Sequence, residues 1–171
     1  MDLFQALEER ASVREFEPVQ VPHEDLLRIL DAGRRAPSGM NRQPYHFIVI
    51  TEGETLRRMC EAQECIGQVF LAIAIVAHPN QSKFWLEDIS ACATNMLLAI
   101  HALGYASVWI EGRLMSREEE WKNLLGVPKE DRLLIVLPIG RAKAPVPQKQ
   151  KRPLSEVVYL NRYGQPFLPS S

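Results

Sequence analysis

The sequence of 171 residues predicts one α+β domain, in which helices cover a central sheet. Three observations support this fold class. Apolar residues make up 46% of the chain, which is enough for one sizeable core. The continuous apolar run from Val69 to Ala77 is typical of a strand that is covered on both faces. The segment from Phe84 to Leu103 has helical periodicity and is apolar nearly all round, which is typical of a buried helix.

The composition argues against nucleic-acid and membrane partners. The formal net charge is −1 at pH 7, and both signs are spread along the chain. No apolar run approaches the length of a membrane helix, and the acidic, amphipathic N-terminus does not resemble a signal peptide, so we expect a cytoplasmic protein. The spacing of Cys60, Cys65 and Cys92 fits neither a CxxC pair nor a zinc half-site. We therefore expect reduced, mostly buried thiols and no metal site.

The N-terminal half is expected to alternate helices with strands. A short amphipathic helix should run from about Asp2 to Ala11. A second helix should begin at Pro22 and stop at Ala36, because the residue before a proline disfavours helical geometry. His46 to Thr51 reads as a strand. A further helix, marked by Leu56, Met59 and Cys60, should precede the covered strand described above.

The C-terminal half is expected to begin with the long helix. This helix should open at Ser82 and end at Gly104 in a left-handed cap. A short strand should follow from Ser107 to Ile110. The run Ser116-Arg117-Glu118-Glu119 has the pattern of a capping box for a helix that Gly126 closes. Leu133 to Leu137 predicts another strand. Because Pro138 has no amide hydrogen, either this strand lies at the margin of the sheet or Pro138 marks the end of the strand.

The polar exceptions on the long helix, and the arm after Gly140, call for separate interpretation. Asp88, Asn95 and His101 interrupt the apolar helix, and we interpret them as satisfied core groups. Residues 144–153 are rich in proline and lack periodicity, which predicts an extended arm. The apolar pattern resumes at Val157 to Leu160, so the arm must dock on another surface.

A loop between a helix and a strand is the first candidate binding site. Pro37 and Pro44 fix backbone angles, and Gly39 permits close approach of a ligand. Between the prolines lie hydroxyl and amide groups that could bond the carbonyl oxygens and ring nitrogens of a flat heterocycle such as an isoalloxazine; these are Ser38, Asn41 and Gln43. The alternative is an ordinary surface turn, since the same residue types gather in turns for conformational reasons.

A basic cluster near the N-terminus is the second candidate. Arg10-Ala11-Ser12-Val13-Arg14 carries two guanidinium groups and a hydroxyl within five residues, which suits a phosphate. The alternative is a solvated face on which the arginines pair with neighbouring glutamates, namely Glu8, Glu9, Glu15 or Glu17. The basic end of the arm is a further candidate for a phosphate. Glu111-Gly112 follows a predicted strand at its carboxyl end, where open sheets place their ligands.

Several chemistries lack their motifs in this sequence. It contains no GxGxxG, P-loop, GxSxG or HExxH pattern, and its four histidines are scattered. A nucleotide-type cofactor held by loops, arginines and amides is the economical interpretation.

Over nearly its whole length, the sequence resembles the nitroreductase family of FMN-dependent oxidoreductases, in its short form. The matching segments, in chain order, are Arg10-Ala11-Ser12-Val13-Arg14, Pro37-Ser38-Gly39-Met40-Asn41-Arg42-Gln43-Pro44, Asp88-Ile89-Ser90-Ala91 with Asn95-Met96-Leu97-Leu98, Trp109-Ile110-Glu111-Gly112, and Gly140 followed by Lys151-Arg152-Pro153-Leu154. Each segment is weak alone, but their order makes the resemblance fairly specific. It implies a three-layer α-β-α fold with a central mixed sheet. It also implies a single domain over residues 1–171 and a homodimer, in which an arm from about residue 141 to 171 packs on the partner subunit.

The resemblance also implies where FMN binds. Arg10 and Arg14, helped by Ser12 and by Arg152 from the arm, would hold the phosphate. The loop, through Pro37, Ser38, Gly39, Asn41 and Gln43, would contact flavin bound mainly by the partner subunit, and backbone at Ile110, Glu111 and Gly112 would lie near flavin N5. One departure from the family pattern is Ala11, where many relatives carry Arg or His, so one contact is expected to be missing. The segment between Ala77 and Phe84 is short, which implies an open substrate pocket.

The implied activity is electron transfer through the flavin. NADH or NADPH would donate a hydride to N5 and leave, and a nitroaromatic, quinone or similar small acceptor would then take the electrons by a ping-pong mechanism. The cofactor carries this chemistry, so no catalytic side chain is predicted. The alternatives are a flavin-binding protein of the same fold without NAD(P)H turnover, and a reductive dehalogenase or flavin-cleaving relative.

Overall fold

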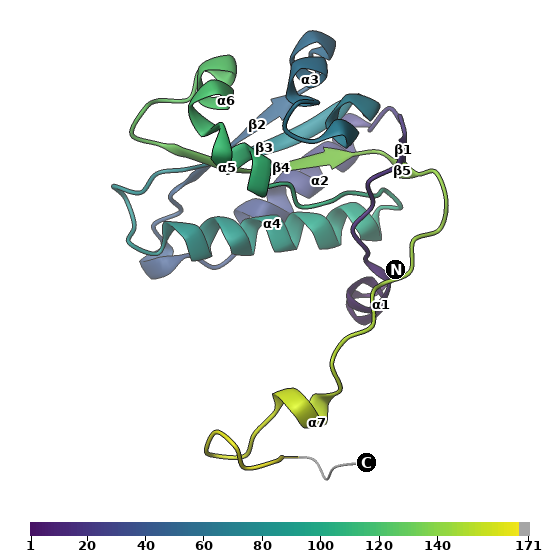
Figure 1. The fold of residues 1–171 in the computed structure, drawn as a ribbon, viewed down its shortest axis with the longest axis vertical. Helices are drawn as coiled ribbons and strands as arrows, with labels where there is room; N and C mark the ends of the chain where they lie inside the picture. Colours follow the sequence, from purple (N-terminus) through teal and green to yellow (C-terminus); the bar gives the residue numbers. More distant parts are fainter. Residues whose placement is uncertain (168–171) are drawn as a thin grey trace.

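The computed structural model describes residues 1–167 and has three layers, with a sheet between two layers of helices (Figure 1). The sheet has the order β2-β3-β4, formed by β2 (Tyr45–Ile50), β3 (Leu71–Ala77) and β4 (Arg132–Ile139), and both pairings are antiparallel. All seven residues of β3 are buried, which confirms the strand predicted to be covered on both faces. Pro138 lies in β4, which borders only β3 in this sheet, as expected of a residue without an amide hydrogen.

The family resemblance implied a sheet with both parallel and antiparallel pairs. Within the described residues the parallel pairing is limited to one bridge, between Ser12 and Ser107. The segment from Ser107 to Ile110 does not form the predicted strand. Its residues pair with different parts of the chain, because Val13 N donates to Ser107 O at 3.0 Å whereas Ile110 bridges Val136 in β4. A continuous ladder cannot form when the partner changes within four residues. A second, two-stranded sheet joins β1 (Phe16–Glu17) to β5 (Arg141–Ala142).

The helices divide between the two faces of the sheet (Figure 1). One face is covered by α2 (His23–Arg34) and α4 (Trp85–Ala102). The opposite face is covered by four short elements, namely α3 (Gly53–Met59), η2 (Glu64–Gln68), α5 (Gly112–Ser116) and α6 (Glu118–Leu125). The first helix, α1 (Leu3–Glu9), contacts α4. The arrangement confirms the expected α+β fold with three layers.

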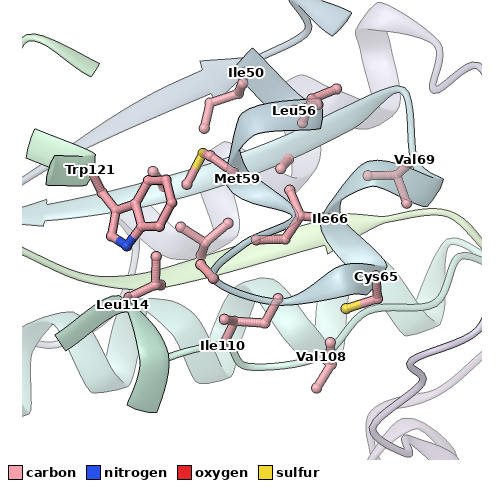
Figure 2. Close-up of a cluster of buried hydrophobic side chains, with 14 of the residues drawn as sticks. Ile50, Leu56, Met59, Cys65, Ile66, Val69, Val108, Ile110, Leu114 and Trp121 are labelled. Carbon is pink, nitrogen blue, oxygen red and sulfur yellow. The ribbon is translucent and has the colours of Figure 1, made fainter. Parts of the chain in front are cut away.

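The residues of β3 alternate between two hydrophobic clusters, as the two-residue period of a strand requires. Ala72, Ala74 and Val76 join the cluster on the α3 and α6 side, which Figure 2 shows with Trp121 and Met59 packed into it. The other residues of β3 join the cluster formed with α2 and α4; these are Leu71, Ile73, Ile75 and Ala77. The sheet is thus buried from both sides by apolar side chains.

The predicted helix ends are mostly confirmed. Gly104 and Gly126 have φ angles of 85° and 68°, in the left-handed region that glycine adopts without steric cost. The capping box at Ser116 is wrong. Ser116 is the last residue of α5, a helix that the sequence did not predict, and its Oγ donates to Arg113 O at 3.0 Å. As a result α6 begins at Glu118 without a side-chain cap.

Apolar side chains remain exposed on the arm and on part of α4. Residues 144–153 have no regular secondary structure, as expected of an extended arm, and lead to α7 (Leu154–Val157) at a distance from the sheet (Figure 1). Large apolar side chains are exposed along this end of the chain, namely Leu154, Val157, Tyr159, Leu160, Tyr163 and Phe167. On α4, Leu86 is 44% exposed, so within one chain this helix is not covered on every side.

Two further features of residues 1–167 concern the thiols and the membrane. Cys65 and Cys92 are buried and Cys60 is half-buried, and all three are free, as predicted. Burial raises the pKa of Cys65 to about 11. No helix in this part of the chain combines the length and the apolar character needed to cross a bilayer.

Candidate functional site

The basic cluster predicted from the sequence lines a cavity of about 200 Å³. Arg10, directly after α1, contributes to it together with Ala11, Ser12 and Arg14. The arm adds two cations, Lys149 and Lys151, and two apolar residues, Val146 and Pro147. Within residues 1–167 none of the four cations forms an ion pair, so the predicted alternative of pairing with neighbouring glutamates is not observed. Four uncompensated positive charges around one cavity suit a phosphate.

A larger cavity, of about 550 Å³, adjoins the basic one. The two cavities share Arg10, Ser12 and Lys151. The other lining residues are mostly apolar or uncharged and come from α1, α4, the segment before α5 and the arm, namely Leu7, Thr94, Leu97, Leu98, Trp109 and Gln148. An elongated ligand with a charged end and a flat apolar body would match this pair of cavities.

The arm is attached to α1 through one side chain. Gln148 Nε2 donates to Leu7 O at 2.8 Å and to Arg10 O at 3.0 Å. These carbonyls lie at the C-terminal end of α1, where backbone acceptors lack helical partners. The contact fixes the arm beside the basic cluster and thereby places Lys149 and Lys151.

Arg152, which was predicted to hold the phosphate with Arg10 and Arg14, lies outside the cavity that those two arginines line. Its Nε donates to Glu156 Oε2 at 3.1 Å, and it lines neither of the two cavities. The sequence predicted a phosphate site at the basic end of the arm, but it singled out only Arg152 there and assigned no contact to Lys149, Lys151 or Trp109. A signal for the lysines was present, because side chains two residues apart on an extended chain point to the same side.

The predicted loop lines a separate cavity of about 470 Å³. Pro37, Ser38 and Gly39 form one wall, and the start of α4 forms the other through Phe84, Glu87, Asp88 and Ala91. Asn41 and Gln43 lie next to this wall but do not line the cavity.

The backbone of this loop is strained. Met40, Asn41 and Gln43 have φ angles of 53°, 57° and 50°, although none of them is glycine. Such angles cost on the order of 1 kcal/mol or more per residue, least for asparagine, and persist only where surrounding contacts hold them. Gln43 N donates to Ser38 Oγ at 3.1 Å, and Gln43 Nε2 donates to Asn41 O at 3.0 Å. Strain of this kind clusters at functional sites, which favours a binding loop over an ordinary turn.

The loop is fastened to α4 through a buried carboxylate. Gly39 N donates to Asp88 Oδ1 at 2.8 Å, and Ser82 Oγ donates to Asp88 Oδ2 at 3.0 Å. Gly39 also lies so close to Phe84 that an added Cβ would be 2.6 Å from Cδ2 of that ring. Asp88 is thus a satisfied buried group, as the sequence predicted, but the group that it satisfies belongs to the candidate loop.

Two titratable groups near the loop, Tyr45 and Cys92, are neutral at physiological pH. Burial raises the pKa of Tyr45 and of Cys92, each to about 12. Tyr45 lies directly after the loop, and its hydroxyl donates to Arg34 O at 3.0 Å.

The third predicted segment presents mainly its backbone. Ile110 is buried and exchanges hydrogen bonds with Val136 at 3.1 and 3.0 Å. Glu111 accepts a hydrogen bond from Trp109 Nε1 at 2.8 Å, which ties this segment to the indole that lines the 550 Å³ cavity. Gly112 begins α5, and a Cβ there would meet open space.

The loop cavity of 470 Å³ and the 550 Å³ cavity beside the basic cluster lie along different parts of α4. The loop cavity contacts α4 as far as Ala91, and the 550 Å³ cavity contacts it from Thr94 to Leu98. The two share no lining residue, and Asp88 and Leu97 are nine residues apart, which is roughly 13 Å along a helix. One chain therefore brings Arg10, Ala11, Ser12 and Arg14 together with the arm, but not with the loop.

Comparison with known proteins identifies relatives of this chain. The model of the Nitroreductase family matches residues 7–72 and 67–141. A protein of Archaeoglobus fulgidus, named as a candidate NADH dehydrogenase/NAD(P)H nitroreductase, is 38% identical over 144 residues, which cover 78% of this chain and 82% of the relative. An iodotyrosine deiodinase of Thermotoga neapolitana is 27% identical over 180 residues, which cover 91% of this chain and 95% of the relative.

A solved structure shares the fold. The FMN-dependent nitroreductase of Clostridium difficile R20291 superposes with a TM-score of 0.85 at 26% identity, covering 94% of this chain and 99% of the other. The family match spans most of the chain and agrees with the relative that is more than 30% identical. The chain belongs to the Nitroreductase family.

Proposed function

We propose that this protein is an FMN-dependent oxidoreductase that passes electrons from NADH or NADPH to a small acceptor, such as a nitroaromatic or a quinone. The observation that carries the proposal is the convergence of Ser12 and four cations, none of which forms an ion pair within residues 1–167, beside a larger, mostly apolar cavity. The similarity to a solved FMN-dependent nitroreductase supports the choice of cofactor.

The basic cavity has the donors that a phosphate monoester needs. A phosphate carries a charge of about −1.5 to −2 at pH 7. The planar guanidinium groups of Arg10 and Arg14 can each donate two parallel hydrogen bonds to it, and Lys149 and Lys151 add point charges. Ser12 supplies a short hydroxyl donor. Ala11 contributes no hydrogen bond, so this chain relies more on the arm than a relative with Arg or His there would.

The neighbouring cavity suits the remainder of the cofactor. Leu97, Leu98 and Trp109 can cover a flat ring system and exclude water from it. When bound, FMN would supply the redox chemistry, since it can accept a hydride and pass on two electrons. The residues of this chain bind and orient the reactants, and we assign no side-chain acid or base. Arg152 remains a proposed phosphate contact, but the arm would have to move for Arg152 to reach the basic cavity.

We infer that two chains complete the site. The loop with Pro37, Ser38, Gly39, Asn41 and Gln43 lines a different part of α4 from the phosphate-suited cavities, so a loop from a partner subunit could cover the ring. Backbone at Ile110, Glu111 and Gly112 would lie near the reactive edge of the ring. The exposed apolar side chains of the arm would pack on the partner, since large exposed apolar patches usually mark interfaces.

Reductive dehalogenation is the second candidate, favoured by the similarity to an iodotyrosine deiodinase over 91% of the chain. Only residues 78–84 join β3 to α4, so this connection has no room for an added lid helix. An open pocket favours small, varied acceptors over a substrate that must be enclosed.

The test begins with the purified protein. We expect a yellow protein that releases FMN on denaturation and oxidises NADH or NADPH when menadione or nitrofurazone is added. Iodotyrosine in the presence of dithionite serves as the competing substrate. A protein that stays colourless after incubation with FMN would refute the proposal, whereas bound FMN with deiodination and no NAD(P)H oxidation would favour the second candidate.

A further inference from the structure

Asp88 is buried in the first half of α4 and joins two loops that line one cavity. The residue is 3% exposed, and its two carboxylate oxygens accept hydrogen bonds from Gly39 N at 2.8 Å and from Ser82 Oγ at 3.0 Å. The same serine oxygen accepts from Phe84 N at 3.1 Å. One carboxylate therefore connects the 37–43 loop with the 82–84 turn, and Gly39 and Phe84 both line the 470 Å³ cavity.

The loop depends on contacts of this kind to keep its conformation. Most hydrogen bonds of residues 38–43 are made within the loop itself. Tyr45 N, at the start of β2, donates to Gln43 O at 2.9 Å. Two further bonds join the loop to segments distant in sequence, namely the one between Gly39 and Asp88 and a longer one from Arg42 Nη1 to Gln81 O at 3.3 Å. Three residues that follow Gly39 have left-handed backbone angles, which an unsupported loop would leave for extended or helical geometry.

Substitutions at Asp88 can separate the effect of its hydrogen bonds from the effect of its negative charge. Both oxygens accept from neutral donors, and the neighbouring Tyr45 and Cys92 are neutral because burial raises the pKa of each to about 12. An asparagine at this position could still accept from Gly39 N through Oδ1, and its Nδ2 could donate to Ser82 Oγ. An alanine could do neither, so it would leave the Gly39 amide without this acceptor.

We propose that Asp88 is a positioning residue that holds the 37–43 loop in the conformation that binds the flavin ring. This inference rests on the proposed function. Both carboxylate oxygens of Asp88 already accept hydrogen bonds from Gly39 N and Ser82 Oγ, so we assign Asp88 no hydrogen bond to the cofactor. It acts through Gly39, whose amide it fixes, and through Phe84, which packs against Gly39 at a distance that only glycine allows.

The test compares three variants of the full-length chain. Asp88→Ala removes the contact, and Asp88→Asn keeps its geometry. The control is Glu118→Ala. Glu118 is a half-buried helix carboxylate that, like Asp88, accepts a hydrogen bond from a backbone amide of another segment, Leu133 N at 2.8 Å; it also pairs with Arg132, and it lines none of the cavities described above. Each variant is measured for thermal stability, for hydrogen exchange of the Gly39 amide without FMN, and for FMN affinity.

We expect Asp88→Ala and Glu118→Ala to lower the melting temperature alike, and only Asp88→Ala to affect the loop. Its Gly39 amide should exchange at least about tenfold faster and its FMN Kd should rise about tenfold, because apparent affinity falls in proportion to the binding-competent fraction. Asp88→Asn should stay within about threefold of the unchanged protein in both measurements, a rescue that a purely stabilising role does not predict.

The inference is overturned if Asp88→Ala matches Glu118→Ala in FMN affinity, or if Asp88→Asn binds FMN as weakly as Asp88→Ala. Failure of the unchanged protein to bind FMN would instead refute the proposed function. In that case the Gly39 exchange rates, which are measured without FMN, still decide whether Asp88 holds the loop.

Discussion

Replacing Arg14 with alanine tests the phosphate-suited cavity most directly. Arg14 lines the 200 Å³ cavity with three other cations, and its side chain is exposed and makes no ion pair within residues 1–167. Its removal should therefore leave no carboxylate unpaired in the folded protein. We expect little change in stability and a specific loss of affinity for a phosphate.

The expected magnitude follows from the loss of a charge-assisted hydrogen bond. Such bonds contribute about 1.5–3 kcal/mol, which corresponds to about a 12-fold to 140-fold rise in the FMN Kd. Because the cluster is open to solvent, the effect should shrink as ionic strength rises from about 0.05 to 0.5 M. The remaining three cations should keep FMN binding measurable.

The assay is a fluorescence titration with FMN and, in parallel, with riboflavin, which lacks the phosphate. Arg14→Ala should weaken FMN binding and leave riboflavin binding unchanged. Arg57→Ala is the control, since Arg57 is an exposed arginine on α3 that pairs with Glu54 and lines none of the cavities described above. An unchanged FMN Kd, or an equal loss for both ligands, would show that Arg14 does not face the phosphate.

Four further predictions follow from the same geometry. Lys151→Ala should raise the FMN Kd more than Arg152→Ala does, because Lys151 lines both cavities while Arg152 pairs with Glu156; the reverse order in a titration would support the contact expected from the sequence. Gly39→Ala should lower the free energy of unfolding by about 1–3 kcal/mol, as overpacking against Phe84 would, and urea denaturation that shows no loss would contradict the close contact. Steady-state kinetics with NADH or NADPH and a quinone should give parallel double-reciprocal plots, because both substrates would use one flavin face; intersecting lines would exclude this ping-pong scheme. Deleting residues from Ala144 onward should weaken dimerisation and FMN binding together, since the arm carries two of the four cations and the exposed apolar residues. Light scattering and flavin titration would measure the two effects, and a truncated chain that stays dimeric and binds FMN as tightly as the full-length chain would contradict this prediction.

Local sequence signals determined the main elements of this protein. The apolar run of β3 and the periodicity of α4 are properties of contiguous residues, so burial and helix type could be read from them. Gly104 and Gly126 ended helices as predicted because a left-handed angle is a local preference of glycine. The two candidate binding segments were likewise visible, since Arg10 to Arg14 and the 37–43 loop concentrate their functional groups within a few residues.

Tertiary structure alone decided the features that depend on partners distant in sequence. The segment from Ser107 to Ile110 has strand-forming residues, but its pairing partners change from the N-terminal segment to β4, so no strand forms. Lys151 lines the two cavities and Arg152 does not, and this placement depends on Gln148, which anchors the arm to α1 about 140 residues earlier. Asp88 looks like a core residue in sequence, and only the fold shows that it lines the loop cavity and accepts a hydrogen bond from Gly39, 49 residues away. Composition and periodicity describe one segment at a time, whereas a binding site is set by which segments the fold brings into contact.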